Sequence, residues 1–492
     1  MTALLVVVAT VLVAVALALR ARRGRDMDLE QWSVGGRGFG SVFVFLLMAG
    51  EIYTTFTFLG GSGWAYGKGG PAFYILCYGS IAFVMSYWLL PTLWRYAKRK
   101  GLLSQADFFT AKFDSPGLGV LVSLVGVVAL VPYLVLQLKG LGIIVSETSG
   151  GRIPYAAAII AGTVVLAAYV TISGVRGSAW TAALKDVLIL VVVVFLGIYL
   201  PLHYFGGFGP MFHAIDAAKP SFLTLPAKGM SPSWFVSTVL LSAFGFYMWP
   251  HSFGAVYTAR DERVFRRNAI VLPLYQLILV FVFFAGFAAV LVVPGLTGSD
   301  GDLSLLRITA KTFDPWFVGV VGGAGVLTAL VPGSLILMTA ATMLAKNIYR
   351  VARPATTDRQ TAVLAKILVP VVALVALYFT FNGGDTIVSL LLMGYSLVTQ
   401  LFPAMILSLC RRRLVNTAGA AAGIVVGVAV VAAFTISGAT LTGLAPWLPQ
   451  PLKDLNTGVV ALVANLVVLG LVTMITRRHR AVRGAPSESV AA

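Results

Sequence analysis

The sequence predicts an all-α polytopic membrane protein with about 13 transmembrane helices. Of its 492 residues, 59% are hydrophobic and only 11% are charged, whereas soluble domains carry about 25% charged residues. Long apolar runs recur along the whole chain, and the 36 Lys and Arg residues are divided unevenly between alternate loops. A soluble fold of this composition would expose too little polar surface to be solvated.

Thirteen apolar runs are long enough to cross a bilayer as helices. They lie near residues 3–20, 40–60, 71–94, 117–138, 155–173, 181–205, 234–257, 269–294, 316–344, 364–381, 387–409, 416–437 and 457–476. The first run lacks a preceding basic stretch and a following small-residue cleavage site, so we expect a retained span and not a signal peptide. We expect one transmembrane domain over 1–482 and a disordered tail at 483–492.

The basic residues predict the orientation of these spans. On one side of the predicted membrane 27 basic residues fall in loops, against eight on the other side, including Lys139. Because loops rich in Lys and Arg stay in the cytoplasm, we expect the N-terminus outside and the C-terminus inside a cell (inner or plasma) membrane. Insertion therefore explains the net charge of +18, and we expect no nucleic-acid partner.

The second apolar run contains the polar stretch EIYTTFTFLGGSG. Glu51 lies about halfway through it, and ionisable residues within a bilayer are functional candidates because their burial is costly. A protonated Glu51 bonded to a neighbouring backbone is the structural alternative. Thr54 and Thr55 offer hydroxyls, while Gly60 and Gly61 begin a stretch that could unwind and expose peptide groups to a substrate or ion. A plain helix end at these glycines fits equally well.

Two charged residues, Lys185 and Asp186, lie in the sixth run. Neighbouring residues point about 100° apart on a helix, so we expect that they do not both face one groove well. In one interpretation Lys185 extends along its aliphatic stem to the cytoplasmic interface. In the other, Lys185 is a fixed cation that reaches a buried carboxylate such as Glu51, and its protonation changes during transport.

The seventh run contains a proline that we expect to act as a hinge. Pro250 interrupts the backbone hydrogen bonds of its helix, and Tyr247, Trp249 and His251 surround it. Aromatic residues in spans are often packing residues, but around an internal Pro-His they predict a substrate pocket. The two cysteines lie within apolar runs, where we expect small core residues and no disulfide.

Catalytic and nucleotide-binding motifs are absent from the sequence. It contains no HExxH, P-loop or G-x-S-x-G motif and only four histidines. We therefore expect no enzyme activity, no metal site and no cofactor. Without an ATP-binding motif, transport must use an ion gradient or the gradient of the solute itself.

Four stretches together resemble the sodium:solute symporter family. They are FLGGSGWAYGKG, TISGVRGSAWTAALKDV, FGFYMWPHSFGAVYTARDERVFRRNAI and PGSLILMTAATMLAKNIYR, and they span most of the chain. The stretch GGRGFGSVFVFLLMAGEIYTTFTFLGGSGWAYGKG, together with WTAALKD, resembles the monocarboxylate permease branch, whose members import lactate, pyruvate and related short acids, and in some cases alanine. The resemblance implies a LeuT-type fold with a 5+5 inverted repeat, about 40–205 and 234–409, one extra N-terminal helix and two extra C-terminal helices. It also implies a substrate site at the broken first helix of each repeat.

The sequence departs from the family pattern at the expected sodium ligands. Val331 and Pro332 occupy the positions of a hydroxyl pair, although Ser334 is close enough to restore one ligand. Ala182 and Lys185 replace an Asp and a Gln that are common in the family. The loss of oxygen ligands and the gain of a cation favour H⁺ over Na⁺ as the coupling ion, with Lys185 in place of the ion.

We predict a cation-coupled secondary active transporter that imports a small monocarboxylate such as pyruvate, lactate, acetate or propionate by alternating access. The expected partners are this carboxylate, the coupling cation and the lipid bilayer. A sodium-coupled symporter of another small solute, such as an amino acid or vitamin, is the main alternative. A solute-sensing membrane module, a membrane enzyme and a passive channel are further alternatives.

Overall fold

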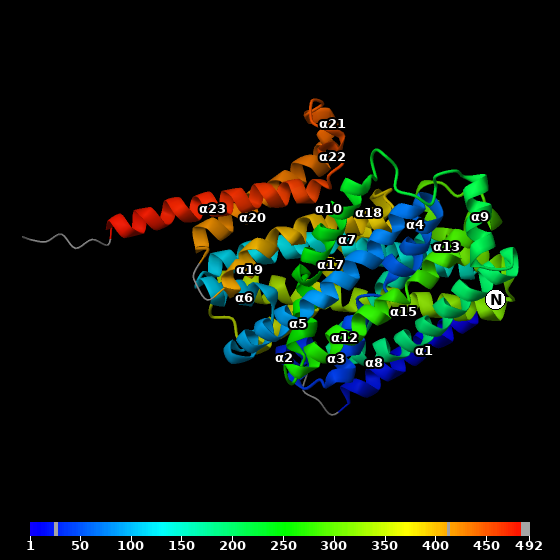
Figure 1. The fold of residues 1–492 in the computed structure, drawn as a ribbon. Coiled ribbons are helices and arrows are strands. Elements are labelled where there is room, and N and C mark those ends of the chain that lie inside the picture. Colours follow the sequence, from blue (N-terminus) through cyan, green and yellow to red (C-terminus); the bar gives the residue numbers. More distant parts are fainter. Residues whose placement is uncertain (24–27, 411–413, 484–492) are drawn as a thin grey trace, which may run out of the picture.

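The computed structural model describes residues 1–23, 28–410 and 414–483, and these residues fold almost entirely into helices (Figure 1). Eleven of the described helices are long and apolar enough to cross a membrane. Two shorter apolar segments, Ser41–Gly50 and Pro232–Met248, complete the thirteen crossings that the sequence predicts. The predicted tail after residue 483 lies outside the described residues.

The crossing segments follow one another in two sets of five, with one helix before them and two after them. The first helix is α1 (Thr2–Arg22). The first set comprises α3 (Ser41–Gly50) continued by η2 (Phe56–Gly60) and α4 (Gly61–Lys68), α5 (Tyr74–Lys100), α7 (Pro116–Thr148) and α8 (Tyr155–Phe205), which Gly174 divides into two spans. In the second set, the first crossing is α10 (Pro232–Gly245) continued by η4 (Phe246–Met248) and α11 (Pro250–Tyr257), and the second is α12 (Arg263–Leu277) with α13 (Val280–Val292). The third crossing is α15 (Pro315–Thr342) with η6 (Met343–Tyr349) and α16 (Arg350–Ala352). The fourth is α17 (Asp358–Asn382), and the fifth is α18 (Ile387–Val398) with η7 (Thr399–Leu401) and α19 (Phe402–Leu409). The last two helices are α20 (Thr417–Ser437) and α23 (Thr457–Arg483).

Short helices connect these segments at both ends of the molecule. They are α2 (Leu29–Val34), η1 (Gly35–Arg37), η3 (Gly70–Phe73), α6 (Gln105–Phe113), α9 (Phe208–Ala218), η5 (Gly298–Leu303), α14 (Ser304–Thr312), α21 (Leu441–Leu444) and α22 (Gln450–Lys453). Of these, α6 and η5 matter most for the site, because they pack against the interrupted helices from opposite ends.

The crossing helices form two packed groups. In the first group, which we call the bundle, α5 packs against α10 and α12, and α13 packs against α4. In the second group, the frame, α15 packs against α7, α8 and α17. Both interrupted helices, α3–α4 and α10–α11, belong to the bundle. The two groups meet where α8 packs against α13 and α3.

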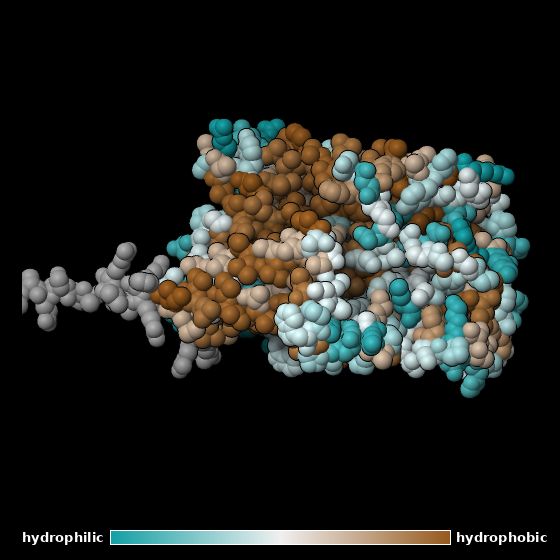
Figure 2. Space-filling view, turned by 90° about the horizontal axis from the view of Figure 1, so that it is seen from above, coloured by the Kyte–Doolittle hydropathy of each residue, from teal (hydrophilic) through white to brown (hydrophobic). Residues whose placement is uncertain are grey.

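The helices outside the two sets of five attach to different parts of the molecule. The helix α1 lies along α15 and α8, and its backbone and side chains fill the space where side chains at Gly319, Gly322 and Gly323 would stand. The helices α20 and α23 pack against each other, and α23 is tied to η7 by the Asn465 amide, which donates to the Gln400 carbonyl oxygen at 2.7 Å. Figure 2 shows a broad apolar area on one face of the molecule, as expected of a surface that meets lipid.

Candidate functional site

The first interrupted helix breaks between α3 and η2, at residues 51–55. There, the hydroxyls of Thr54 and Thr57 form hydrogen bonds with backbone groups that lack their usual helical partners. The Thr57 hydroxyl donates to the Ile52 carbonyl oxygen at 2.6 Å and accepts from the Thr54 amide at 3.0 Å. The Thr54 hydroxyl accepts from the Phe56 amide at 3.2 Å. Because irregular backbone within a bilayer must find partners inside the protein, these hydroxyls make the break possible.

A buried cation holds the break from the side of the frame. The Lys185 ammonium, on α8, donates to the carbonyl oxygens of Gly50 at 3.3 Å and Tyr53 at 3.0 Å. It also lies 2.9 Å from the Asp186 carboxylate, and its side chain is 0% exposed. Lys185 therefore does not extend to the cytoplasmic interface. Although adjacent residues point about 100° apart on a helix, the Lys185 and Asp186 side chains are long enough to form this ion pair.

The carboxylate of Glu51 joins the two interrupted helices. Its Oε2 atom accepts a hydrogen bond of 2.7 Å from the Ser252 hydroxyl on α11. Its Oε1 atom is buried and has no hydrogen-bond partner within the described residues. In this structure Lys185 forms its ion pair with Asp186 and not with Glu51. Glu51 is thus a half-buried acid with one buried oxygen that has no hydrogen-bond partner among the described residues.

The second interrupted helix breaks at Trp249. This residue has extended backbone angles, with φ −64° and ψ 129°, between η4 and α11. The cause is Pro250, because a proline disfavours helical backbone in the residue before it. The side-chain amide of Gln105, on α6, donates to the freed Met248 carbonyl oxygen at 2.7 Å. Pro250 stands at the start of α11, where its missing N–H costs nothing; its role as a hinge stays a prediction.

Aromatic and polar side chains surround the second break. The Tyr133 ring, on α7, lies 4.8 Å from the Trp249 ring and 5.3 Å from the His251 ring, measured between centroids. The His251 Nδ1 atom is buried and unpartnered within the described chain. Gln137 lies one turn after Tyr133 on the same face of α7. Its Oε1 atom accepts from the Thr55 hydroxyl at 2.6 Å, and its amide nitrogen has no partner among the described residues.

The glycines after the break have a different role from the predicted one. Gly60 and Gly61 have helical backbone angles, so the expected unwinding at these positions is wrong and the chain unwinds at residues 51–55. A Cβ atom at Gly60 would stand 2.9 Å from the Ile387 side chain, and one at Gly61 would stand 3.2 Å from the Phe283 ring. These glycines therefore allow α4 to pack closely against α18 and α13.

Ser334 lies beside the Lys185 site and does not contact the ammonium. Its hydroxyl donates to the Val331 carbonyl oxygen at 2.6 Å and lies 2.7 Å from the Ser178 hydroxyl. Ser178 precedes Lys185 by two turns of α8, so both face the same side of that helix. Tyr247, the remaining predicted site residue, is buried beside Phe246, with 5.0 Å between the ring centroids.

Sequence analysis missed three residues of this region. They are Ser252, which bonds to Glu51, Gln137, which bonds to Thr55, and Tyr133, which packs on Trp249. Gln137 could have been found, because it is an amide inside an apolar run and such residues need a partner in the bilayer. Ser252 gave no such signal, since a serine satisfies its own helix backbone at little cost.

We call the end of the bundle that the sequence predicts to face outside the outer end, and the opposite end the inner end. The outer end is closed by η5. Its Asp302 carboxylate accepts from the Ile387 amide, at the start of α18, at 3.1 Å. A Cβ atom at Gly63 would stand 2.8 Å from Asp302 Oδ1, so this glycine allows η5 to rest on α4. Lys139 lies nearby; it is inside α7 and not in an outer loop as predicted, and it donates to the Asp385 carbonyl oxygen. Burial raises the pKa of Asp302 to about 6, although the Ile387 hydrogen bond and Lys139 partly offset it.

The closed position of η5 is expected to become more stable as the pH falls from about 7 to about 5. An exposed Asp has a pKa of about 3.9, so the buried Asp302 binds a proton more tightly and protonation favours its packed position. At higher pH the ionised carboxylate opposes burial, and the nearby Lys139 ammonium partly offsets this. Hydrogen exchange of residues 298–303, corrected for the intrinsic effect of pH, should slow over this range.

The variant Asp302→Asn should remove this dependence on pH, because the amide oxygen still accepts from Ile387 but does not titrate. Asp300→Asn is the matched control, since Asp300 is an exposed residue of the same short helix. An unchanged pH response in Asp302→Asn would show that another group controls the closure.

The inner end is closed by α6. Ser104 and Asp107 form a capping box at its start, and the Asp107 carboxylate also accepts from Lys346 and, at 2.7 Å, from the Asn347 amide. Burial alone would raise the pKa of Asp107, but the Lys346 ammonium and the hydrogen bonds from Leu103 and Asn347 outweigh it and hold the pKa below its usual range. A cavity that Pro250 and Ser104 line has a volume of about 10 Å³, enough for about one water molecule. The structure is thus tightly packed on both sides of the breaks.

Solved structures share this architecture. The structure of a substrate-bound, outward-open Na⁺-coupled sialic acid symporter matches with a TM-score of 0.78 and 16% sequence identity, covering 100% of this chain and 99% of that chain. The match shows the fold. Together with two sets of five crossings that each begin with an interrupted helix, it defines the class: a multi-pass membrane protein with the LeuT transporter fold.

The sequence comparisons then give the family. Residues 32–427 match the sodium:solute symporter family, and this chain belongs to that family. An uncharacterized symporter, YhjB, of Bacillus subtilis (strain 168) is 64% identical over 92% of each chain. A monocarboxylate transport permease protein of Rhizobium johnstonii is 29% identical, again over 92% of each chain. The resemblance seen in the sequence is therefore confirmed at the level of the family.

Proposed function

We propose that this symporter imports a small monocarboxylate, such as pyruvate, lactate, acetate or propionate, together with protons. The observation that carries the proposal is the Lys185 ammonium at the first break, bound by two carbonyl oxygens at the end of α3 and by Asp186. Backbone carbonyls at such a break can coordinate a coupling cation in transporters of this kind. In this protein the Lys185 ammonium, a cation of the chain itself, already binds the carbonyl oxygens of Gly50 and Tyr53.

The acids around the breaks favour a proton as the coupling ion. Lys185 uses its donors on Gly50, Tyr53 and Asp186, so loss of its proton would leave Asp186 as an uncompensated buried charge. Glu51 has no cation paired with it and one free oxygen. Protonation of Glu51 would therefore neutralise the remaining negative charge without disturbing the Lys185 contacts.

The substrate is proposed to bind between the two breaks, where donors lack partners. His251 Nδ1 and the amide nitrogen of Gln137 are buried without partners among the described residues, and either can donate to a carboxylate. The Tyr133 and Trp249 rings offer apolar surface for a short acyl chain. Pro250 acts as the hinge of α11, and opening of η5 outside or α6 inside gives access from one side at a time. A relative named as a monocarboxylate permease supports this substrate class.

Uptake of labelled pyruvate into proteoliposomes tests the proposal. We expect accumulation when the outside is made acidic in the absence of sodium, and inhibition by excess lactate, acetate or propionate. Proline is the comparison solute, because an amino-acid symporter is the main alternative. Accumulation driven by a sodium gradient alone would contradict the coupling ion, and inhibition by proline but not by lactate would contradict the substrate class. Counterflow of preloaded pyruvate distinguishes a carrier from a channel or a sensor.

A further inference from the structure

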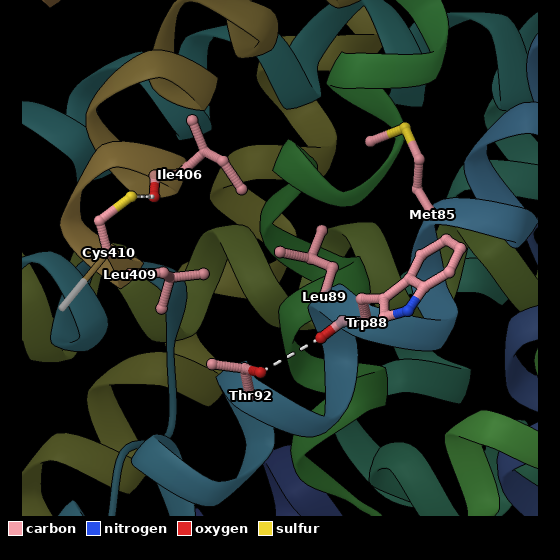
Figure 3. A pocket seen from close by; sticks show the side chains of 7 residues that line it. All are labelled: Met85, Trp88, Leu89, Thr92, Ile406, Leu409 and Cys410. Carbon is pink, nitrogen blue, oxygen red and sulfur yellow. Dashed lines mark hydrogen bonds between the residues drawn. The ribbon is translucent and has the colours of Figure 1, made fainter.

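An apolar groove lies between α5 and α19, away from the interrupted helices (Figure 3). Its volume is about 390 Å³, and Figure 3 shows the seven side chains that line it: Met85, Trp88, Leu89, Thr92, Ile406, Leu409 and Cys410. Two of the polar side chains in this lining are occupied, because the Thr92 hydroxyl donates to the Trp88 carbonyl oxygen at 3.2 Å and the Cys410 thiol to that of Ile406 at 3.8 Å. Apart from the Trp88 indole nitrogen, the groove therefore offers mainly apolar surface.

A second, polar cavity adjoins this groove at Cys410, which is exposed and not a core residue as predicted. Its volume is about 910 Å³, and it lies among the ends of α5, α6, α19, α20 and α23. Three of its lining residues are cationic, namely Lys100, Lys112 and Arg477, whereas Asp114 is the one acidic residue in the lining. The cavity therefore presents a local excess of positive charge.

None of these three cations forms a salt bridge within the described residues. The Lys112 ammonium instead lies 4.7 Å from the centre of the Tyr96 ring. Partial burial, together with nearby Arg99, lowers the pKa of Lys112. An anion placed in this cavity would relieve the repulsion between the cations.

We propose that this composite site binds an anionic glycerophospholipid from the membrane leaflet on the predicted cytoplasmic side. One acyl chain would occupy the groove between α5 and α19, and the phosphate would lie in the cavity lined by Lys100, Lys112 and Arg477. Charge complementarity favours this ligand over a zwitterionic lipid, because basic pockets between membrane helices attract anionic head groups. The exposed Trp88 ring, 68% accessible, adds a broad apolar face to the groove against which an acyl chain can pack.

Binding of the lipid would join two parts of the molecule. The helix α5 belongs to the bundle, whereas α20 and α23 follow the two sets of five. A lipid that contacts α5 with its chain and α23 with its phosphate would connect the C-terminal pair to the bundle. The lipid site is distinct from the proposed substrate site, so a negative result for lipid binding would not contradict the proposed transport function.

The experiment compares lipid retention by the full chain purified in detergent and mixed with phosphatidylglycerol or phosphatidylcholine. We expect native mass spectrometry to show retained phosphatidylglycerol, and a thermal unfolding midpoint that rises with phosphatidylglycerol but not with phosphatidylcholine. The triple variant Lys100→Gln, Lys112→Gln and Arg477→Gln should bind phosphatidylglycerol at least about tenfold more weakly, because each cation near an anionic head group contributes favourably.

A matched control and a second variant keep the test decisive. Lys68→Gln and Lys219→Gln, at the opposite end of the molecule, should bind the lipid as the wild type does. Thr92→Phe should weaken binding by filling the groove while it keeps all three cations. Equal retention of both lipids, or of phosphatidylglycerol by the triple variant and Thr92→Phe, would overturn the proposal. Stabilisation by inorganic phosphate alone, or displacement of the lipid by an acidic peptide, would also overturn it.

Discussion

Replacing Lys185 by methionine is expected to abolish uptake and to destabilise the folded transporter. The ammonium is fully buried and balances the Asp186 carboxylate at 2.9 Å. Removing one partner of a buried ion pair typically costs about 3–5 kcal/mol, because the other charge stays uncompensated. Thermal unfolding of the purified variant measures the loss of stability, and labelled pyruvate uptake into proteoliposomes measures the loss of transport.

Two further variants separate stability from coupling. The double variant Lys185→Met and Asp186→Leu removes both charges, so its unfolding temperature should recover much of the loss while uptake stays abolished. Lys68→Met is the matched control, because Lys68 is exposed at the end of α4, and it should leave both measurements near those of the wild type. A Lys185→Met variant that folds and transports normally would mean that the buried pair has no role in coupling.

Replacing Glu51 by glutamine is expected to remove the acceleration of uptake by external acid. Glutamine imitates the protonated acid and keeps an oxygen that can accept from the Ser252 hydroxyl. The variant should therefore still exchange preloaded pyruvate for external pyruvate, but should no longer accumulate it against a gradient. Counterflow and acid-driven uptake, measured in the same proteoliposomes, report these two properties.

The control for Glu51→Gln is the same substitution at a partly exposed glutamate, Glu147. Glu147 is part of a partly exposed ion pair with Arg307 at 3.5 Å, and Glu147→Gln should leave acid-driven uptake within a few-fold of the wild type, since exposed ion pairs contribute little. If Glu51→Gln keeps its full dependence on external acid, Glu51 does not carry the coupling proton.

The membrane-crossing segments could be predicted from sequence because the bilayer imposes a minimum apolar length. Even the two interrupted helices were found, since each half keeps an apolar composition. The assignment of the spans to two sets of five came from the family resemblance, because hydropathy alone does not show which spans form a repeat. The position of the second break was also predictable, because Pro250 restricts the backbone of Trp249 directly.

The first break could not be placed correctly from sequence. Glycine weakens a helix in water, so Gly60 and Gly61 were the natural candidates for unwinding. Within the packed protein they instead serve close contacts with Ile387 and Phe283. The chain unwinds where other groups can satisfy the backbone, and one of these, Lys185, is more than a hundred residues away in the sequence. Hydrogen bonds between residues so far apart in the chain leave no local pattern in the sequence.

The N-terminal helix has a consequence for how the membrane acts on the transporter. The glycines of α15 let α1 approach closely, and α15 is the most deeply buried of the long apolar helices in the described part of the chain. The packing of α1 thus covers part of α15 from the lipid. The Ser178–Ser334 contact beside Lys185 is buried at α15, so its geometry should vary little with the thickness or lipid composition of the bilayer.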